Sequence, residues 1–390
     1  MKYTTCTIFI LLFAYFAVSA QVNPFPKISK RVQKTPNELS QDLEGLSQYL
    51  VEKAETDKEK AWAIYRWITL SIDYDKYAYK NGSKRINRTV ADILSRRMAV
   101  CFGYATLFKA MCEKVGLKCE LVVGYSKGTL TSTPDLAKPD HAWNAVRIDG
   151  EWALLDATWG SSLIHAENDF VQRFKEGYFL TTPESFIVNH LPIDPMWQLL
   201  DCPIDTEVYR QTPEQIQQHL ARTEPCYSYQ DSIEHFLSRP LIEQKLQNIK
   251  NAYRYNPTED NRKELVQSYM DYASRLSDQA DAYQLTGKLD SFIQMQSQVL
   301  EACEQASARG SLFKWQQELY ITTLMNQAVA LYQQAEELDN TSSASNYKEA
   351  LEFLEKAQVL LEELPDDFFT GPAKEQCEQY LEVIRPLVVN

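Results

Sequence analysis

Apolar and polar positions roughly alternate over residues 141–148 and again over residues 151–158, and both segments are rich in β-branched and aromatic side chains. This pattern predicts two β-strands. Asp149-Gly150 lies between them, and this dipeptide is typical of the two-residue type I′ turn that closes a tight hairpin. The sequence therefore predicts an antiparallel hairpin over residues 141–158.

The register of this hairpin brings two ionisable side chains together. With a two-residue turn, Trp143 faces Asp156, and residues two apart along a strand share a face. His141 and Asp156 are then diagonal neighbours, with backbones about 7–8 Å apart and side chains within reach of a hydrogen bond. A slip of one residue would send the two side chains to opposite faces.

A helix is predicted directly after Cys101. Apolar residues recur at helical spacing over residues 102–115, and Gly116 marks the end of the pattern. Cys101 is therefore expected at or just before the first helical turn, where free N–H groups and the helix dipole favour a thiolate. The positive charges of Arg96 and Arg97, just upstream, favour it further.

The C-terminal part, residues 207–390, is almost purely helical in pattern. Its glycines, Gly287, Gly310 and Gly371, are expected at breaks between helices. Over residues 330–365, two amphipathic helices flank a polar turn. The small residues that allow this pair to pack closely are Ala330, Ala335, Ala350 and Ala357. The pair resembles a tetratricopeptide-type hairpin, but no period of about 34 residues is visible upstream, so a generic helical array is an equal alternative.

Charge divides the chain into two parts. Residues 1–206 hold 24 basic and 24 acidic side chains, whereas residues 207–390 hold 16 and 29, so the net charge of −13 arises in the second part. The turn-rich segment 192–213 lies at this change. We therefore expect two domains, residues 21–206 and 207–390. An acidic chain without a basic patch argues against nucleic-acid binding.

Residues 1–20 have the features of a secretory signal. They contain one lysine near the start, an apolar run over residues 8–18 and Val-Ser-Ala before Gln21. Cys6 precedes the apolar run, so we do not interpret it as a lipid-attachment site. No later stretch approaches the length of about 20 apolar residues that a membrane span needs. We expect a secreted or periplasmic protein without a transmembrane segment.

Seven cysteines follow the expected signal: Cys101, Cys112, Cys119, Cys202, Cys226, Cys303 and Cys377. An odd number in an oxidising compartment leaves at least one thiol unpaired, which agrees with a free Cys101. Cys112 and Cys119 are a candidate disulfide pair, because they span the end of the predicted helix and the start of the next strand. A zinc site made of Cys101, Cys112, Cys119 and His141 is disfavoured, because the short CxxC spacing of such sites is missing. We therefore expect no metal and no cofactor.

Cys101, His141 and Asp156 occur in the order of a nucleophile, a base and an orienting carboxylate. A thiol nucleophile needs a base to take its proton and a carboxylate to orient that base. The backbone N–H of Cys101, at a helix start, is a candidate oxyanion donor. Each residue alone is more often structural, but their joint occurrence favours catalysis.

Three blocks carry a family resemblance: AWAIYRWITLSIDYD, VCFGYATLFKAMCEKVGLKCELVVGYSKG and HAWNAVRIDGEWALLDATWG. With YFLTTPESFIVNHLPIDPMWQLL, they resemble the transglutaminase-like superfamily of papain-fold cysteine enzymes, in its kyphoscoliosis-peptidase-like and bacterial transglutaminase-like branch, over about residues 58–205. The resemblance implies a papain-like α+β core, with the cysteine helix packed on an antiparallel sheet, and the all-α helical array follows it here. It also implies Cys101 as the nucleophile, His141 as the general base and acid, and Asp156 as the orienting carboxylate.

The resemblance leaves the reaction open. We expect a secreted cysteine enzyme that acts on peptide or protein amide bonds through an acyl-thioester, and hydrolysis is favoured because water needs no acceptor site. The alternatives are acyl transfer from protein glutamine, which cross-links proteins, and a non-catalytic extracellular binding module with a vestigial papain-like core. The expected partners are a protein or peptide substrate and a protein that binds the helical domain.

Four further residues are candidates for the substrate cleft. Trp143 and Trp159 flank the predicted His–Asp pair and would either wall the cleft or pack in the core. Tyr125 would line the cleft entrance, and Gly103 would leave room for a substrate carbonyl. The remaining histidines have no partner identifiable from the sequence and are treated as non-catalytic: His165, His190, His219 and His235.

Overall fold

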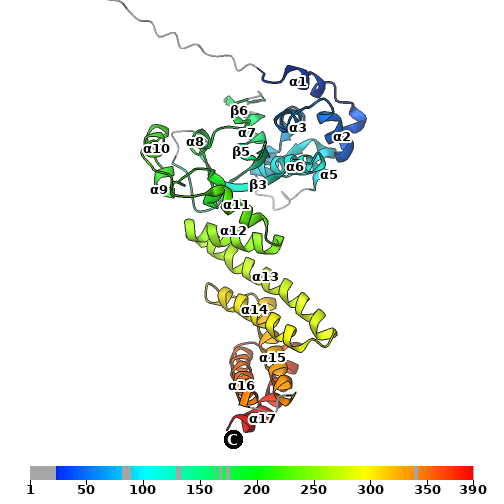
Figure 1. The fold of residues 1–390 in the computed structure, drawn as a ribbon, viewed down its shortest axis with the longest axis vertical. Coiled ribbons are helices and arrows are strands. Elements are labelled where there is room, and N and C mark those ends of the chain that lie inside the picture. Colours follow the sequence, from blue (N-terminus) through cyan, green and yellow to red (C-terminus); the bar gives the residue numbers. More distant parts are fainter. Residues whose placement is uncertain are drawn as a thin grey trace, which may run out of the picture. The chain divides into compact units, whose positions relative to one another are not determined.

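The computed structural model describes residues 23–80, 89–128, 133–161, 163–166, 169–172, 176–337 and 341–389 (Figure 1). The expected signal, residues 1–20, lies outside these ranges. Contacts divide the chain into one unit of residues 1–121 and 143–181 and a second unit of residues 122–142 and 182–390. The domain boundaries derived from charge stay a prediction. Among the residues that the structure describes, no helix is both long and apolar enough to cross a membrane.

The helices, in chain order, are α1 (Pro26–Val32), η1 (Asn37–Gln41), α2 (Leu43–Val51), α3 (Asp57–Ser71), α4 (Lys76–Lys80), α5 (Val90–Arg96), α6 (Cys101–Lys114), α7 (Ala157–Gly160), η3 (Glu176–Tyr178), α8 (Pro183–Phe186), η4 (Pro195–Gln198), α9 (Thr206–Tyr209), α10 (Pro213–Leu220), α11 (Tyr229–Leu237), α12 (Leu241–Tyr255), α13 (Glu259–Leu285), α14 (Leu289–Ser307), α15 (Lys314–Glu337), α16 (Thr341–Glu362) and α17 (Thr370–Val389). The strands are β1 (Asp73–Tyr74), β2 (Met98–Ala99), β3 (Cys119–Ser126), β4 (His141–Ile148), β5 (Glu151–Leu155), β6 (Leu163–Ala166), β7 (Asp169–Gln172) and β8 (His190–Pro192).

The cysteine helix α6 lies in the core of the first unit. It begins at Cys101, as the apolar spacing predicted. Its buried side chains, among them Leu107 and Phe108, share one apolar cluster with Val146 and Leu155 of the sheet. The sheet has the strand order β5-β4-β3-β8, and its β4–β5 and β3–β8 pairs are antiparallel. The predicted packing of a cysteine helix on an antiparallel sheet is confirmed.

A buried amide joins the cysteine helix to the sheet. Asn144 of β4 is completely buried. Its Nδ2 donates to the carbonyl oxygen of Ala105 in α6 at 3.0 Å and to that of Glu120 in β3 at 3.2 Å. A buried amide without hydrogen-bond partners destabilises a protein, so these two bonds favour one arrangement of α6, β3 and β4 over alternatives.

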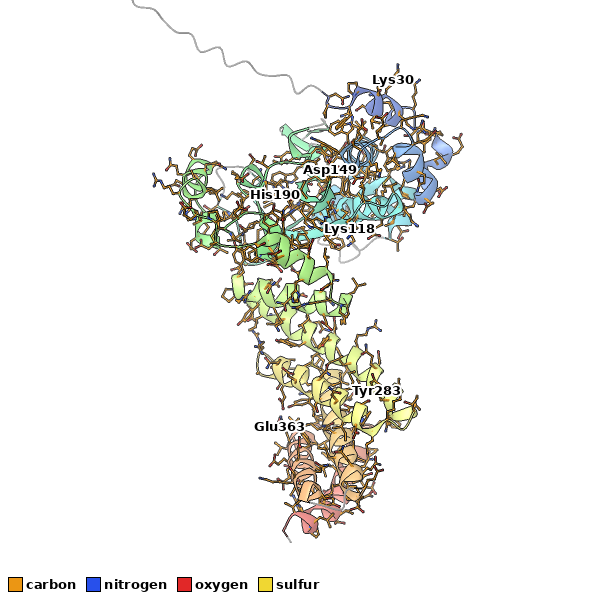
Figure 2. The ribbon with its side chains drawn as sticks, viewed as in Figure 1. Lys30, Lys118, Asp149, His190, Tyr283 and Glu363 are labelled. Carbon is orange, nitrogen blue, oxygen red and sulfur yellow. A yellow bond between two sulfur atoms is a disulfide. The ribbon has the colours of Figure 1, made fainter. Side chains whose placement is uncertain are left out.

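The β4–β5 hairpin has the predicted register. Ile148 pairs with Glu151 beside the turn, and the pairing continues as far as Asn144 and Leu155. Both turn residues have positive φ, 51° at Asp149 and 94° at Gly150, as a type I′ turn requires. Asp149 is labelled in Figure 2.

The second strand of the hairpin ends earlier than predicted. We expected it to continue to residue 158, but β5 stops at Leu155. Asp156 becomes the N-cap of α7, and its backbone N–H donates to the carbonyl oxygen of Tyr178 at 2.9 Å. The predicted pairing of Trp143 with Asp156 is therefore replaced by a helix cap, a motif that favours aspartate and ends a strand.

Helices α12 to α17 of the second unit pack in series, each against the next in the chain (Figure 1). α15 ends at Glu337 and α16 begins at Thr341, and the three residues of the predicted polar turn between them lie outside the described residues. The four alanines of this pair are buried, as close packing requires: Ala330, Ala335, Ala350 and Ala357. Gly287 follows α13 with a positive φ and Gly310 lies between α14 and α15, whereas Gly371 is the second residue of α17. The predicted all-α array is confirmed.

The disulfide differs from the candidate pair. The bond joins Cys202 and Cys226, while Cys112 and Cys119 are buried thiols. Cys112 lies next to Cys119, and burial together with this neighbour raises its pKa, so both cysteines serve as apolar packing groups. Sequence proximity to the end of a helix therefore did not identify the bonded pair. Cys101 likewise takes part in no disulfide, and it is half-buried.

Replacing Gly103 tests how closely α6 packs on its neighbours. A Cβ atom at Gly103 would lie 2.7 Å from Cβ of Ala99 and 3.2 Å from Cδ1 of Ile93. Gly103→Ala should therefore lower the free energy of unfolding by about 1–3 kcal/mol in urea denaturation. Gly371→Ala is the matched control, because a methyl group at Gly371 would meet nothing within 4 Å, and it should be neutral or slightly stabilising. Equal stability of the two variants would contradict the packing argument.

Asp194 should make stability depend on pH. Its carboxylate accepts from Met196 N at 3.1 Å and from Asn251 Nδ2 at 2.8 Å, and burial raises its pKa to about 6. A raised pKa means that the folded state holds the proton more tightly. The tighter proton binding stabilises the folded state fully below the unfolded pKa of about 4. As the pH rises through 6 this stabilisation is lost, which lowers the free energy of unfolding by about 3 kcal/mol. Asp194→Asn should remove it when urea unfolding is compared between pH 4 and pH 7. An unchanged pH slope would contradict this assignment.

Candidate active site

Cys101 is the first residue of α6, and its side chain is partly exposed. The N-cap is Val100, whose side chain makes no capping hydrogen bond. The first N–H groups of a helix lack intrahelical acceptors, and a valine cannot supply one. This helix terminus therefore presents donors and a positive dipole end beside the sulfur, a setting that favours a thiolate and a developing oxyanion.

Tyr74 links the surroundings of Cys101 and Asp156. Strand β1 pairs in parallel with β2, which places Tyr74 opposite Ala99, two residues before the cysteine. Burial raises the pKa of Tyr74, and the negative charges of Cys101 and Asp156 raise it further. The phenol hydroxyl is therefore close enough to both groups to sense their charge.

The carboxylate of Asp156 is completely buried and has a defined orientation. Its Oδ1 accepts from the backbone N–H of Thr158 at 2.7 Å and of Trp159 at 3.1 Å. These bonds cap α7 and fix the carboxyl group in one rotamer. Asp156 therefore follows the end of β5 and also holds its negative charge in a fixed orientation.

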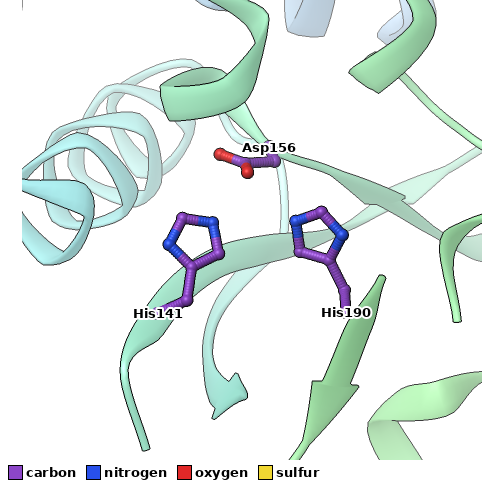
Figure 3. Close-up of side chains that lie close together, drawn as sticks. All are labelled: His141, Asp156 and His190. Atoms are coloured by element: carbon purple, nitrogen blue, oxygen red, sulfur yellow. The ribbon is translucent and has the colours of Figure 1, made fainter. Parts of the chain in front are cut away.

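Three strand ends bring His141, Asp156 and His190 together. One ligand-type atom from each side chain lies within 4.8 Å of those of the other two. Figure 3 shows the two imidazole rings on either side of the Asp156 carboxylate. All three residues are buried, with exposed fractions of 7% for His141, 0% for Asp156 and 1% for His190. The sequence prediction that His141 and Asp156 are neighbours agrees with this geometry.

His190 is the member of this cluster that the sequence did not identify. No partner for it was identifiable from the sequence, whereas the structure surrounds it with several. The centroid of its ring lies 5.4 Å from the ring centroid of His141 and 4.0 Å from that of Phe186, on which it stacks. Its Nδ1 contacts Oδ1 of Asn189 at 2.6 Å. The one sequence signal for His190 was its position in an apolar, strand-like stretch. Its place in the site depends on the pairing of β8 with β3, in which His190 lies opposite Ser126, and these strands are far apart in the sequence.

The four cleft candidates differ in burial. Trp143 and Tyr125 are almost completely buried, and the Tyr125 hydroxyl accepts from Nδ2 of Asn256 at 2.9 Å. Gly103 packs closely against its neighbours in α5 and β2, so packing accounts for this glycine. The ring of Trp159 is partly exposed and meets Tyr178 edge-on at 5.5 Å. Of the four, only Trp159 combines partial exposure with proximity to Asp156 in the chain.

The other histidines lie elsewhere. His219 and His235 are exposed on α10 and α11, and His165 is part of β6. The cluster of His141, Asp156 and His190 offers imidazole and carboxylate groups, which serve acid–base chemistry and also suit a divalent metal ion.

Known proteins share the segment that holds the cysteine helix and the hairpin. A family model of the transglutaminase-like superfamily matches residues 44–157. Kyphoscoliosis peptidase from Homo sapiens is 41% identical over 164 residues, which are 41% of this chain and 25% of that protein. Hillarin from Drosophila melanogaster is 30% identical over 201 residues, which are 48% of this chain and 23% of that protein. The chain thus spans about a quarter of the length of these relatives.

A solved structure of a TGase is 18% identical and covers 42% of this chain and 38% of that chain. The TM-score of this match is 0.25. The matched residues of the family model include the whole of α6 and the β4–β5 hairpin. Residues 44–157 of this protein therefore form a domain of the transglutaminase-like superfamily.

Proposed function

We propose that the protein is a cysteine enzyme of the transglutaminase-like type that hydrolyses amide bonds of peptides or proteins. Cys101 is the nucleophile, His141 the general base and acid, and Asp156 the carboxylate that orients the imidazole. The observation that carries the proposal is the buried pair of His141 and Asp156 at the ends of β4 and β5, in a chain whose half-buried thiol begins α6.

The first half of the reaction forms an acyl-enzyme. The sulfur of Cys101 gives up its proton to His141 and attacks the carbonyl carbon of the amide, forming a C–S bond. The carbonyl oxygen becomes an oxyanion, which the backbone N–H groups at the start of α6 stabilise. The tetrahedral intermediate collapses, the C–N bond breaks, and His141 returns the proton to the leaving amine.

The second half releases the acid. Water attacks the thioester carbon while His141 takes a proton from it, and the C–S bond breaks to return Cys101 and a carboxylic acid. Asp156 stabilises the imidazolium that forms in each half, and its own orientation depends on the two backbone bonds of α7. Burial strengthens this electrostatic pairing, because water does not screen it.

We also propose that the protein acts outside the cytoplasm. The predicted signal over residues 1–20 supports export, and the Cys202–Cys226 disulfide is a feature that persists in oxidising compartments. The acidic helical array α12–α17 would then recruit a protein substrate or partner from the same compartment, since arrays of this kind offer extended binding surfaces.

Cys101→Ala should abolish cleavage of a synthetic peptide library, measured as new amino termini by mass spectrometry, and should leave the fold intact. In the native wild-type protein at neutral pH, iodoacetamide should label Cys101, because the thiolate is the reactive form. Cys303 and Cys377 should stay unlabelled, because burial raises their pKa to about 12 and about 11.

Cys303→Ala is the matched control and should cleave like the wild-type protein. Unchanged turnover in Cys101→Ala would refute the proposal. Incorporation of a labelled primary amine into glutamine-containing protein, in place of new termini, would assign acyl transfer instead of hydrolysis.

Two substitutions at Asp156 should separate its role as a helix cap from its role in catalysis. Asp156→Ala removes the acceptor of the Thr158 and Trp159 N–H groups and should destabilise the protein by about 1–2 kcal/mol. Asp156→Asn keeps an acceptor oxygen and should be more stable than Asp156→Ala, while losing turnover by a factor of about 10⁴, as when an orienting carboxylate is neutralised. Thermal unfolding and peptide turnover measure the two effects. Wild-type turnover in Asp156→Asn would contradict the orienting role.

A further inference from the structure

We propose that His141, Asp156 and His190 form a binding site for a zinc ion, and that zinc bound there inhibits the thiol chemistry. The inhibition rests on the proposed function, but the binding does not. His190 is the residue that distinguishes this site from the Cys101–His141–Asp156 arrangement, because hydrolysis as derived above does not use it.

The distances fit a zinc ion. Three atoms no more than 4.8 Å apart all lie within about 2.8 Å of a common point, whereas zinc bonds to nitrogen and carboxylate oxygen are about 2.0–2.2 Å long. Each ligand atom therefore needs to move inward by about 0.8 Å or less, which small side-chain rotations provide. The separation of 5.4 Å between the two imidazole centroids agrees with two rings that flank one ion.

The donor set also fits zinc. Two imidazoles and one carboxylate, with one position left open, form a common zinc ligand set, while magnesium and calcium prefer sites made only of oxygen. The side chains here are almost completely buried, and the three groups already face one another (Figure 3). Because metal ligands must be deprotonated, binding of a divalent cation here should become weaker as the pH falls.

Neighbouring groups hold two of the three ligands in place. Oδ1 of Asn189 contacts Nδ1 of His190 at 2.6 Å, which directs the Nε2 lone pair of that ring toward the cluster. Phe186 stacks on the same ring at 4.0 Å and restrains its rotation. The two backbone bonds of α7 restrain the Asp156 carboxyl group. Outer contacts of this kind usually strengthen metal binding by about 10- to 100-fold.

Zinc in this position would block catalysis. It would take the ring nitrogen of His141 that faces Asp156 together with the carboxylate that orients this ring, and an imidazole bound to a cation is no longer a base. A reversible inhibitor site would thus share two residues with the catalytic arrangement and add a third, His190.

Calorimetric titration of the full chain with Zn²⁺ tests the binding. The wild-type protein should bind one ion per chain, and His190→Ala should bind at least tenfold more weakly. His219→Ala and His235→Ala remove exposed histidines on α10 and α11 and are the matched controls, which should bind like the wild-type protein. Cys101→Ala should also keep its affinity. Mg²⁺ and Ca²⁺ should not bind at the same concentrations.

An X-ray absorption spectrum of the zinc-loaded wild-type protein does not depend on the folding of any variant, and it should show two imidazole ligands. Wild-type affinity in His190→Ala, loss of binding in Cys101→Ala, or fewer than two imidazoles in the spectrum would overturn the proposed site.

The inhibition is tested on peptide turnover. Zn²⁺ should lower the turnover of the wild-type protein and a chelator should restore it, and the half-inhibiting concentration should rise at least tenfold in His190→Ala. Turnover that zinc leaves unchanged despite binding would overturn the inhibitory role. If the wild-type protein shows no thiol-dependent turnover at all, the proposed function fails while the calorimetric result stands.

Discussion

The buried amide of Asn144 is the contact on which the relation between the cysteine helix and the sheet depends. Its two hydrogen bonds hold the carbonyl groups of Ala105 in α6 and Glu120 in β3. Ala105 lies one turn after Cys101, and Asn144 lies three residues after His141 on the same strand. Apolar packing is tolerant of small shifts, whereas an amide with two fixed acceptors is not. The position of the thiol along the sheet is therefore set by a polar group in the core.

The local elements of the site could be predicted from the sequence. The hairpin register follows from the two-residue turn at Asp149-Gly150, and the start of α6 follows from the apolar spacing after Cys101. Both features depend on residues close together in the chain, whose conformational preferences act without the rest of the fold. The proximity of His141 and Asp156 is a direct result of this local order.

The features that the sequence did not predict depend on long-range pairing. β8 joins the sheet beside β3, and this alone brings His190 to the cluster. The disulfide between Cys202 and Cys226 likewise needs a particular path of the chain after η4 and through α9 and α10. The early end of β5 has a different cause, because Asp156 favours a helix cap over continued strand pairing. Strand propensity alone does not show that a helix cap competes with the strand at this residue.

One oxygen of the Asp156 carboxylate accepts the two backbone hydrogen bonds that cap α7, whereas the negative charge belongs to the whole carboxylate. Exchange of an aspartate for an asparagine is a single-nucleotide change in the genetic code, and an asparagine can still cap a helix although it carries no charge. One substitution at this position can therefore remove a buried negative charge while the architecture around α7 persists.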